Sequence, residues 1–232
     1  MDGMAFDTAL VTGAGTGFGL ALTTALARRG TAVIAVARDA DRLRAAVAEL
    51  PGARALPGDI TDPTFRAALA DAVGDRLDLL VHNAGALGPS PLPLLADYPL
   101  DALRDVLETT VVAPLGLTRL LLPALRRAPA PAVVTLSSDV AVEAYPGWGG
   151  YGSAKAALDR LATQLAVEEP AIRVHAFDPG DMRTAMHQAA FPGEDISDRP
   201  EPETAVPALL RLLDERPPSG RYRAADLAGS PA

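Results

Sequence analysis

The chain of 232 residues has no cysteine, a single lysine and a single asparagine. Without cysteine it can form no disulfide, offers no thiolate nucleophile and has no thiolate ligand for a metal. Its three histidines, His82, His175 and His187, lie too far apart to form an HxxxH pair, so a zinc site built on histidine is not expected. The sequence therefore predicts no metal centre.

Basic charge is also scarce. The formal net charge is −8, which gives no positive field to attract a nucleic-acid backbone or an anionic membrane surface. The first residues lack the basic region of a signal peptide, and Arg, Asp or Pro interrupts each apolar run before it reaches the roughly 20 residues of a membrane-spanning helix. We therefore expect a cytoplasmic protein that binds neither nucleic acid nor membrane.

The composition is that of a packed globule, with 49% hydrophobic and 22% charged residues. The length suits one substantial α/β domain or two small ones. No linker, repeat or shift in composition divides the chain, so residues 1–232 are expected to form one domain.

Short apolar runs alternate with longer helical patterns. Strands are predicted at 8–12, 32–37, 54–56, 77–82, 132–137 and 172–177 and near Tyr222. Helices are predicted at 20–29, 39–50, 63–74, 100–126, 152–169 and 204–215, the fourth of them bent near Pro114. Helices between successive strands make those strands parallel. The predicted fold class is α/β, a single doubly wound Rossmann-type domain with a parallel sheet of about seven strands.

A glycine cluster, Thr12-Gly-Ala-Gly-Thr-Gly-Phe-Gly19, separates the first strand from the first helix. Glycine allows a tight turn and lets backbone N–H groups approach a pyrophosphate at the positive end of the helix. A purely structural turn is the alternative, but the position between a strand and an amphipathic helix favours a dinucleotide site. The spacing TGxxxGxG resembles that of the short-chain dehydrogenase/reductase family. The residues expected to contact the nucleotide here are Gly13, Gly15, Thr16, Gly17, Phe18 and Gly19.

The second strand ends in Ala37, Arg38 and Asp39. Family members that prefer NAD carry Asp where this chain has Ala37, and a basic residue at the position of Arg38 is linked to NADP. A guanidinium pairs with the 2′-phosphate of NADP, whereas a carboxylate repels it. NADP is therefore expected. NAD stays open because Thr16 supplies no second positive charge and Asp39 could accept from a ribose hydroxyl. The alternative to a phosphate contact is that Arg38 is a solvated surface residue with no ligand.

Two further segments extend the resemblance. Gly58-Asp59-Ile60 is similar to the element that contacts adenine in the family, which implies roles for Asp59 and Ile60. The segment from His82 to Gly85 is similar to the family's N-N-A-G motif, with His82 in place of the first Asn. Asn83 could instead be a turn former, because its amide can bond neighbouring backbone. The residues that this motif implies for the cofactor site are Asn83, Ala84 and Gly85.

Tyr151 and Lys155 stand at i and i+4 on one helical face. A phenol has a pKa of about 10, and a nearby cation lowers it, so that proton exchange becomes feasible near neutral pH. Ser138 lies at the end of the fifth predicted strand, where active-site groups gather in open parallel sheets. The family carries a catalytic Ser, Tyr and Lys at this spacing. The resemblance implies that Ser138 bonds the substrate oxygen, Tyr151 transfers the proton, and Lys155 holds the nicotinamide ribose and tunes Tyr151.

The segment Asp178–Thr184 resembles the family's P-G-x-x-x-T motif. Many members also have an Asn in the helix before the catalytic Ser, and its backbone carbonyl holds a relay water. Thr110 stands at that position here, and a Thr hydroxyl can bend a helix by bonding the i−4 carbonyl. We expect an altered relay and an intact cofactor site. The cofactor residues implied by these two segments are Thr110, Pro179, Gly180, Met182 and Thr184.

Loops after the fourth, fifth and sixth strands should face the substrate. Their side chains are mostly apolar or aromatic, which favours a small to medium apolar or aromatic carbonyl compound or alcohol, although Asp139 and Glu143 would suit a polar one. Residues 185–200 have the turns and acids of a short mobile lid. The expected lining residues are Leu87, Leu92, Val140, Val142, Tyr145, Trp148, Met186, His187 and Phe191.

The expected activity is hydride transfer between a nicotinamide nucleotide and a carbonyl or alcohol, as in a carbonyl reductase. Two alternatives stay open: a nucleotide-binding sensor or scaffold without turnover, and a lyase, dehydratase or isomerase that reuses Tyr151 as acid and base. The family resemblance also implies a homo-oligomer, a dimer or tetramer, associated through the helices at 100–126 and 152–169.

Overall fold

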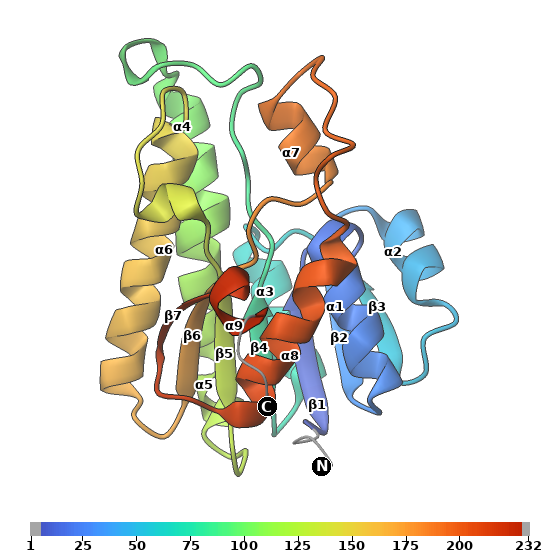
Figure 1. Ribbon diagram of the computed structural model, residues 1–232. Coiled ribbons are helices and arrows are strands. Elements are labelled where there is room, and N and C mark those ends of the chain that lie inside the picture. The colour runs from blue at the N-terminus through green and yellow to red at the C-terminus, as the bar shows by residue number, and fades with distance from the viewer. Residues whose placement is uncertain (1–5, 229–232) are drawn as a thin grey trace.

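The computed structural model describes residues 6–228 (Figure 1). Its centre is a seven-stranded sheet in the order β3-β2-β1-β4-β5-β6-β7, with every neighbouring pair parallel. The predicted α/β fold class is confirmed. The strands are β1 (Thr8–Thr12), β2 (Ala32–Ala37), β3 (Ala53–Pro57), β4 (Leu79–His82), β5 (Ala132–Leu136), β6 (Arg173–Asp178) and β7 (Gly220–Arg223).

Helices join the strands and cover both faces of the sheet (Figure 1). Two of them begin as the sequence predicts, because the side chains of Asp39 and Asp62 accept backbone N–H groups at the starts of α2 and α3. The helices are α1 (Gly17–Arg28), α2 (Ala40–Val47), α3 (Pro63–Val73), α4 (Leu100–Leu107), α5 (Ala113–Leu125), α6 (Gly149–Glu168), α7 (Ala185–Ala190), α8 (Val206–Glu215) and α9 (Ala224–Ala228).

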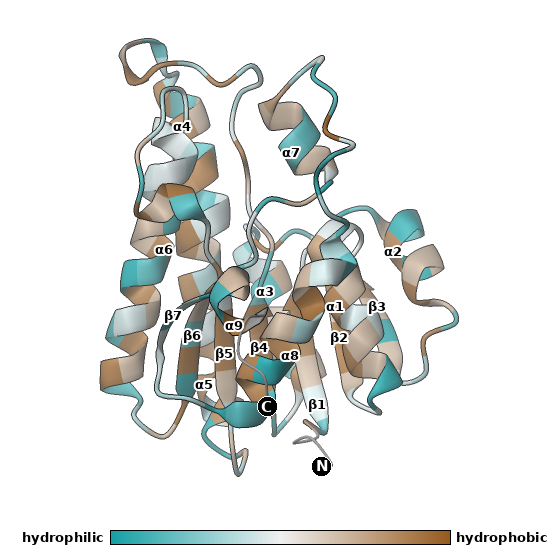
Figure 2. Cartoon of the chain, viewed as in Figure 1, coloured by the Kyte–Doolittle hydropathy of each residue, from teal (hydrophilic) through white to brown (hydrophobic). Residues whose placement is uncertain are grey.

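Apolar strand residues, brown in Figure 2, divide between two cores because successive side chains point to opposite faces. Val11 packs in one core with Leu22 of α1 and Leu209 of α8. Its neighbour Leu10 packs in the other with Leu117 of α5. The chain order reverses between β1 and β4, and this switch point opens a crevice at the carboxyl ends of the strands.

The long helix predicted at 100–126 is interrupted. A π-helical turn, Glu108–Val112, separates α4 from α5, so the distortion lies just before Pro114 rather than at it. Pro114 has no N–H and cannot donate to the carbonyl of Thr110, one turn earlier. It sits instead in the first turn of α5, where its missing N–H costs least.

Other boundaries also differ from the sequence predictions. Helix α6 begins at Gly149 rather than 152, which places Tyr151 in its first turn. Strand β4 begins at Leu79 rather than 77. Neither α7 nor α9 was predicted, because each is only a turn or two long and α7 lies in a segment rich in Pro, Gly and acids.

The stretch Leu100–Leu125 is the one part of residues 6–228 that is long and apolar enough to cross a membrane by length and composition, contrary to our reading of the apolar runs. This is weak evidence for a span, because Leu117, Leu121 and Leu125 are buried in the core beneath the sheet. The start of the chain, on which the signal-peptide prediction rests, lies partly outside the described residues.

Candidate functional site

Two adjoining cavities at the carboxyl end of the sheet contain most of the predicted site residues. The larger, of about 740 Å³, runs from the glycine loop after β1 past the ends of β2, β3 and β4 to the start of α6. We call it the nucleotide cavity. Of the predicted cofactor residues, those that line it are Gly13, Gly15, Thr16, Gly17, Phe18, Arg38, Asp59, Ile60, Asn83, Ala84, Gly85, Tyr151, Lys155, Pro179, Met182 and Thr184.

The glycine loop has the conformation that its sequence requires. Gly13 and Gly17 have φ angles of 67° and 55°, in the left-handed region that side chains disfavour. Thr16 occupies the N-cap position of α1 without a side-chain capping bond, so the first N–H groups of this helix are not capped by Thr16. Unsatisfied N–H groups at a helix N-terminus are suited to bind an anion such as a pyrophosphate.

Asn83 follows β4, the strand that pairs with β1, and its side chain holds the glycine loop in place. Its Nδ2 donates to the carbonyl oxygens of Thr12 and Gly13, at 2.9 and 3.0 Å. The hydroxyl of Thr12 accepts the backbone N–H groups of Asn83 and Ala84, each at 3.1 Å. Asn83 therefore both lines the cavity and braces the loop, so the two roles considered from sequence coexist.

Three predicted cofactor residues do not line the nucleotide cavity. Gly19 lies behind the loop, where an added Cβ would stand 2.3 Å from the carbonyl oxygen of Gly13, so its role is close packing. Gly180 lines the second cavity instead. Thr110 is buried and accepts from the backbone N–H of Ala86 at 3.4 Å, while its neighbour Thr109 lines the cavity.

Arg38 lies exposed at the end of β2, on the rim of the nucleotide cavity. Among residues 6–228, no carboxylate lies within ion-pair distance of it. Arg42, one turn into α2, lines the same rim and pairs with Asp39 at 3.5 Å. A second guanidinium besides Arg38 therefore lines this cavity, and the sequence reasoning did not name it.

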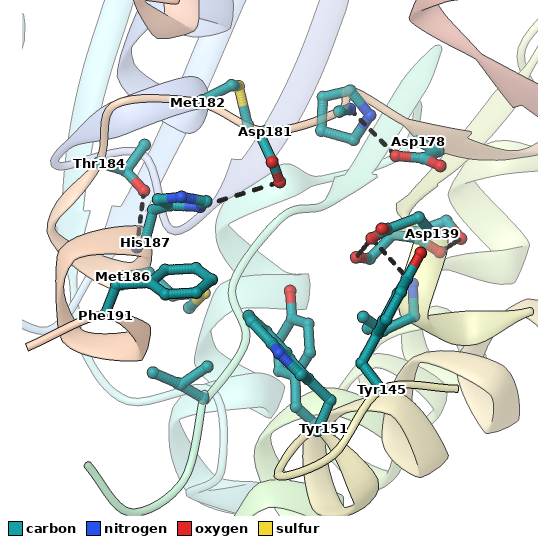
Figure 3. A pocket seen from close by; sticks show the side chains of 17 residues that line it. Asp139, Tyr145, Tyr151, Asp178, Asp181, Met182, Thr184, Met186, His187 and Phe191 are labelled. Carbon is teal, nitrogen blue, oxygen red and sulfur yellow. Dashed lines mark hydrogen bonds and ion pairs between the residues drawn. The ribbon is translucent and has the colours of Figure 1, made fainter. Parts of the chain in front are cut away.

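The second cavity, of about 460 Å³, adjoins the first, and we call it the substrate cavity. Figure 3 shows Asp139, Tyr145 and Tyr151 on one side and Met186, His187 and Phe191 on the other. Ser138 also lines it, so the structure brings Ser138 and Tyr151 to one cavity. Predicted lining residues present here are Leu87, Val140, Tyr145, Trp148, Met186, His187 and Phe191, whereas Leu92 and Val142 are absent from the lining.

Lys155 is buried beneath Tyr151. Its Nζ donates to the carbonyl oxygen of Leu136 at 2.6 Å and lies 5.4 Å from the centre of the Tyr151 ring. Burial lowers the pKa of Lys155 to about 8, against the raising effect of Asp159 and Asp178. The ammonium is thus placed to contact a group bound beside Tyr151.

The pKa of Tyr151 departs from the sequence expectation. It is raised rather than lowered, first because the phenol is buried and then because Asp139 and Asp178 add negative charge. The prediction that the nearby Lys155 cation lowers the pKa of Tyr151 is therefore wrong for this structure. Burial of the phenol and the two carboxylates set the direction of the shift, and burial also disfavours the charge of Lys155 itself.

Arg221 of β7 was missed by the sequence reasoning and joins several parts of the site. Its guanidinium donates to the backbone carbonyl of Ser138 at 2.9 Å and to the carboxylate of Asp178 at 2.8 Å. It also lies 3.3 Å from Asp159, which accepts from the hydroxyl of Ser137. One edge-strand side chain therefore ties β5, β6 and α6 together. No local sequence motif indicates this role of Arg221, because its partners come from three distant segments of the chain.

His82 replaces an asparagine of the family motif and lies buried away from both cavities. Its Nε2 is 2.7 Å from the hydroxyl of Thr118 on α5. Burial lowers the pKa of His82 to about 4, so the ring is neutral near neutral pH. It links β4 to the helix behind it and takes no part in the chemistry of the cavities.

Comparison with known proteins agrees with this geometry. A family model described as short chain dehydrogenase matches residues 7–195. The oxidoreductase YciK of Escherichia coli K12 is 33% identical over 217 residues, covering 89% of this chain and 85% of YciK. Serine 3-dehydrogenase of Agrobacterium fabrum is 37% identical, covering 76% and 72% of the two chains.

A solved structure is also similar over nearly the full length. A short chain dehydrogenase of Escherichia coli CFT073, complexed with NADPH, has a TM-score of 0.86 at 31% identity, covering 97% of this chain and 99% of that one. Fold, motif order and sequence identity agree over most of the chain. The protein is an enzyme of the short-chain dehydrogenase/reductase family.

Proposed function

We propose that the protein is an NADP(H)-dependent oxidoreductase that transfers hydride between nicotinamide and a carbonyl or alcohol on a small to medium substrate. The observation that carries this proposal is that Tyr151 lines both cavities. A phenol shared by a nucleotide site and a substrate site can exchange a proton with a substrate oxygen while the neighbouring carbon exchanges hydride. The NADPH complex of the similar Escherichia coli enzyme supports the choice of nucleotide.

Each polar group then has a role. The nicotinamide nucleotide supplies or accepts the hydride. Ser138 donates a hydrogen bond to the substrate oxygen, and Tyr151 gives or takes the proton at that oxygen. Lys155, held by the carbonyl of Leu136, binds the nicotinamide ribose. The apolar and aromatic part of the substrate cavity holds the rest of the substrate.

Thr110 motivates the alternative of a nucleotide-binding protein without turnover. Two observations favour catalysis instead. Pro114 cannot donate to the Thr110 carbonyl, and an added Cβ on Gly85 would lie 3.7 Å from the Thr110 hydroxyl and 3.8 Å from Lys155 Nζ. The Thr110 hydroxyl and the Lys155 ammonium thus both lie close to Gly85. The Thr110 carbonyl lacks its usual helical donor, which supports a relay through this carbonyl.

The test follows NADPH absorbance with a panel of ketones and aldehydes, for wild type and Tyr151→Phe. We expect turnover in the wild type and a loss of about 10²–10⁴-fold in kcat in the variant, because a positioned acid contributes that much. The variant should keep its NADPH affinity within a few fold. Nucleotide binding without turnover on the whole panel would favour the sensor. Product formation without net NADPH oxidation would favour a lyase or isomerase.

Association and location stay proposals as well. Val112, Leu115 and Leu120 are exposed apolar side chains on or next to α5, which supports a homo-oligomer formed through the long helices. Light scattering of the purified protein would test this, since a monomer at micromolar concentration contradicts it. A cytoplasmic location is tested by fractionating cells that express the chain.

A further inference from the structure

The substrate cavity has a carboxylate beside the reacting groups that the proposed reaction does not use. Asp139 lines the cavity, and its Oδ1 accepts from the hydroxyl of Ser138 and from the backbone N–H of Val140, each at 2.9 Å. Within residues 6–228, no Arg, Lys or His lies within ion-pair distance of this carboxylate. A negative charge without a positive partner therefore lies next to the position of the substrate oxygen.

Asp139 and the substrate oxygen compete for one hydrogen-bond donor, the hydroxyl of Ser138. Ser138 has a single hydroxyl hydrogen, and in the structure that hydrogen points at Asp139. To donate to a substrate oxygen, Ser138 must turn away and leave the carboxylate with one hydrogen bond fewer. Asp139 is exposed in the open cavity, so water can replace the lost bond there. A bound substrate that displaces this water must replace the bond with a donor of its own, and a cationic donor does so most strongly.

The remaining lining suits a cation better than an anion. The rings of Trp148 and Tyr151 lie 5.8 Å apart and those of Trp148 and Phe191 lie 5.9 Å apart, so aromatic groups from α6 and the segment after α7 face one cavity. Aromatic faces attract ammonium groups. The charged side chains of the lining are the carboxylates Asp139, Asp178 and Asp181, beside the ring of His187, and among residues 6–228 no Arg or Lys lines this cavity.

Nearby carboxylates also contribute to raised pKa values of the two tyrosines in this cavity. The hydrogen bond to Glu143 raises the pKa of Tyr145 to about 12, with smaller contributions that include Asp139 and Asp181. Asp139 is likewise one cause of the raised pKa of Tyr151. Asp178 is compensated by Arg221 at 2.8 Å, and Asp181 lies 3.6 Å from Arg199. Asp139 thus differs from both other carboxylates of the lining in having no cationic partner.

We propose that the substrate is a vicinal amino alcohol, or the matching amino ketone, with an apolar or aromatic body, and that its ammonium group pairs with Asp139. This assignment rests on the proposed function, because it names the substrate class of the same site. The carboxylate of Asp139 touches the Ser138 hydroxyl, so the ammonium and the reacting oxygen belong on adjacent carbons. An amino acid is disfavoured, because its carboxylate would meet three aspartates and no Arg or Lys.

The reaction balances without any group beyond the nucleotide. In the oxidising direction Tyr151 first loses its own proton to solvent. The carbinol carbon then gives its hydride to NADP⁺, the hydroxyl proton passes to the Tyr151 phenolate, and a C=O double bond forms. The products are an amino ketone, NADPH and one proton released to solvent, and the C–N bond is unchanged throughout. The ammonium serves recognition only.

The test compares three alcohols as substrates with NADP⁺ near neutral pH: 2-amino-1-phenylethanol, its uncharged isostere 1-phenylpropan-1-ol, and anionic mandelate. The readout is the ratio of kcat/KM for the amine to kcat/KM for the isostere, which cancels any general change in activity. We expect a ratio of about ten or more in the wild type, because a charge-assisted hydrogen bond forms only with the amine, and mandelate as the poorest of the three.

Asp139→Asn is the matched variant, because an amide oxygen still accepts from Ser138 while the charge is lost. Its ratio should fall to about one. Asp181→Asn is the control: Asp181 lies in the same cavity but near Arg199, so the ratio should stay near that of the wild type. A wild-type ratio near one, or a preference that survives in Asp139→Asn, would overturn the amine assignment and leave hydride transfer standing.

Binding separates this proposal from the proposed function. Calorimetry on the NADP⁺-saturated protein gives the ratio of dissociation constants for the amine and the isostere, in wild type and Asp139→Asn. If no alcohol or ketone of any kind is turned over, the proposed function fails. The amine assignment is then decided by whether the wild type binds the amine more tightly and Asp139→Asn loses that preference.

Discussion

The nucleotide cavity and the substrate cavity share Tyr151 but are built differently. The nucleotide cavity depends on backbone: two glycines with positive φ, a helix N-terminus and an asparagine that braces the loop. The substrate cavity depends on side chains from loops after β5 and β6. Backbone requirements restrict a position to glycine and so leave a readable motif, whereas side-chain lining leaves none. A shared cofactor is therefore easier to infer from sequence than an individual substrate.

The largest effect is expected directly behind the glycine loop of the nucleotide cavity, where Gly19 packs against the loop backbone. In Gly19→Ala the new Cβ would meet the Gly13 carbonyl oxygen at 2.3 Å and Asn83 Nδ2 at 2.4 Å, and neither can yield without moving the loop. Overpacking of about 1–3 kcal/mol should lower stability and weaken NADPH by up to about 100-fold. Fluorescence titration and thermal unfolding measure the two effects.

Gly220→Ala on β7 is the control for that variant. Its added Cβ would meet only the ring of Tyr222, at 3.6 Å, and Gly220 lines neither cavity. NADPH affinity should match the wild type. A folded Gly19→Ala protein with normal NADPH affinity would show that the loop is not the pyrophosphate site, and the contrast between the cavities would lose its basis.

A smaller effect is expected at the rim of the nucleotide cavity. Arg38→Ala should weaken NADPH by about tenfold or more and NADH by much less, because only NADPH carries the 2′-phosphate that a guanidinium pairs with. Arg44→Ala is the matched control, since Arg44 lies exposed on the same helix as Arg42 but outside the cavity lining. Isothermal titration with both nucleotides measures this. Equal losses for the two would reject the NADP assignment.

The smallest effect is expected for Arg221, whose contacts join β5, β6 and α6 at the site. Arg221→Met should lower kcat severalfold and move the basic limb of the kcat/KM profile to higher pH. The sign follows because Asp178 already raises the pKa of Tyr151, and loss of its guanidinium partner makes the site more negative. A purely structural role would lower stability without moving that limb.

Two variants sharpen this measurement. Arg221→Lys keeps the positive charge and should restore part of the pH profile. Arg223→Met changes the other arginine of β7, which pairs with Asp226 outside both cavities, and should leave the profile in place. An unchanged profile in Arg221→Met would mean that Arg221 does not act on the proton-transfer groups.

Much of the fold was readable from sequence, for reasons visible at single residues. Asp62 caps the helix predicted after it, the helix predicted from Asp39 begins one residue later with Asp39 as its cap, and the apolar runs before Gly13 and Arg38 are strands. The placement of Ser138, Tyr151 and Asn83 follows from motifs that sit directly after strands or at a helix start. The bend predicted near Pro114 is present as a π-helical turn at Glu108–Val112, but the missing N–H of proline alone does not indicate that the distortion takes this form.

What sequence could not provide depends on tertiary proximity. Arg221 belongs to the site because it contacts Ser138, Asp159 and Asp178, and no local sequence pattern links it to these residues. The raised pKa of Tyr151 follows from burial and from carboxylates placed by the fold. The sequence indicated Asp139 as a contact for a polar substrate. The structure adds that, among residues 6–228, no cationic side chain lies within ion-pair distance of it.

The hydrogen bonds of Asn83 also affect how readily this asparagine deamidates. An asparagine deamidates when the backbone nitrogen of the next residue attacks its side-chain carbonyl. Here the N–H of Ala84 is engaged by the Thr12 hydroxyl, and the Asn83 amide is fixed by two backbone carbonyls. The one asparagine of a chain without cysteine thus occupies a position where both partners of that attack are tied down. The same hydrogen bonds that shape the glycine loop protect it from slow chemical damage.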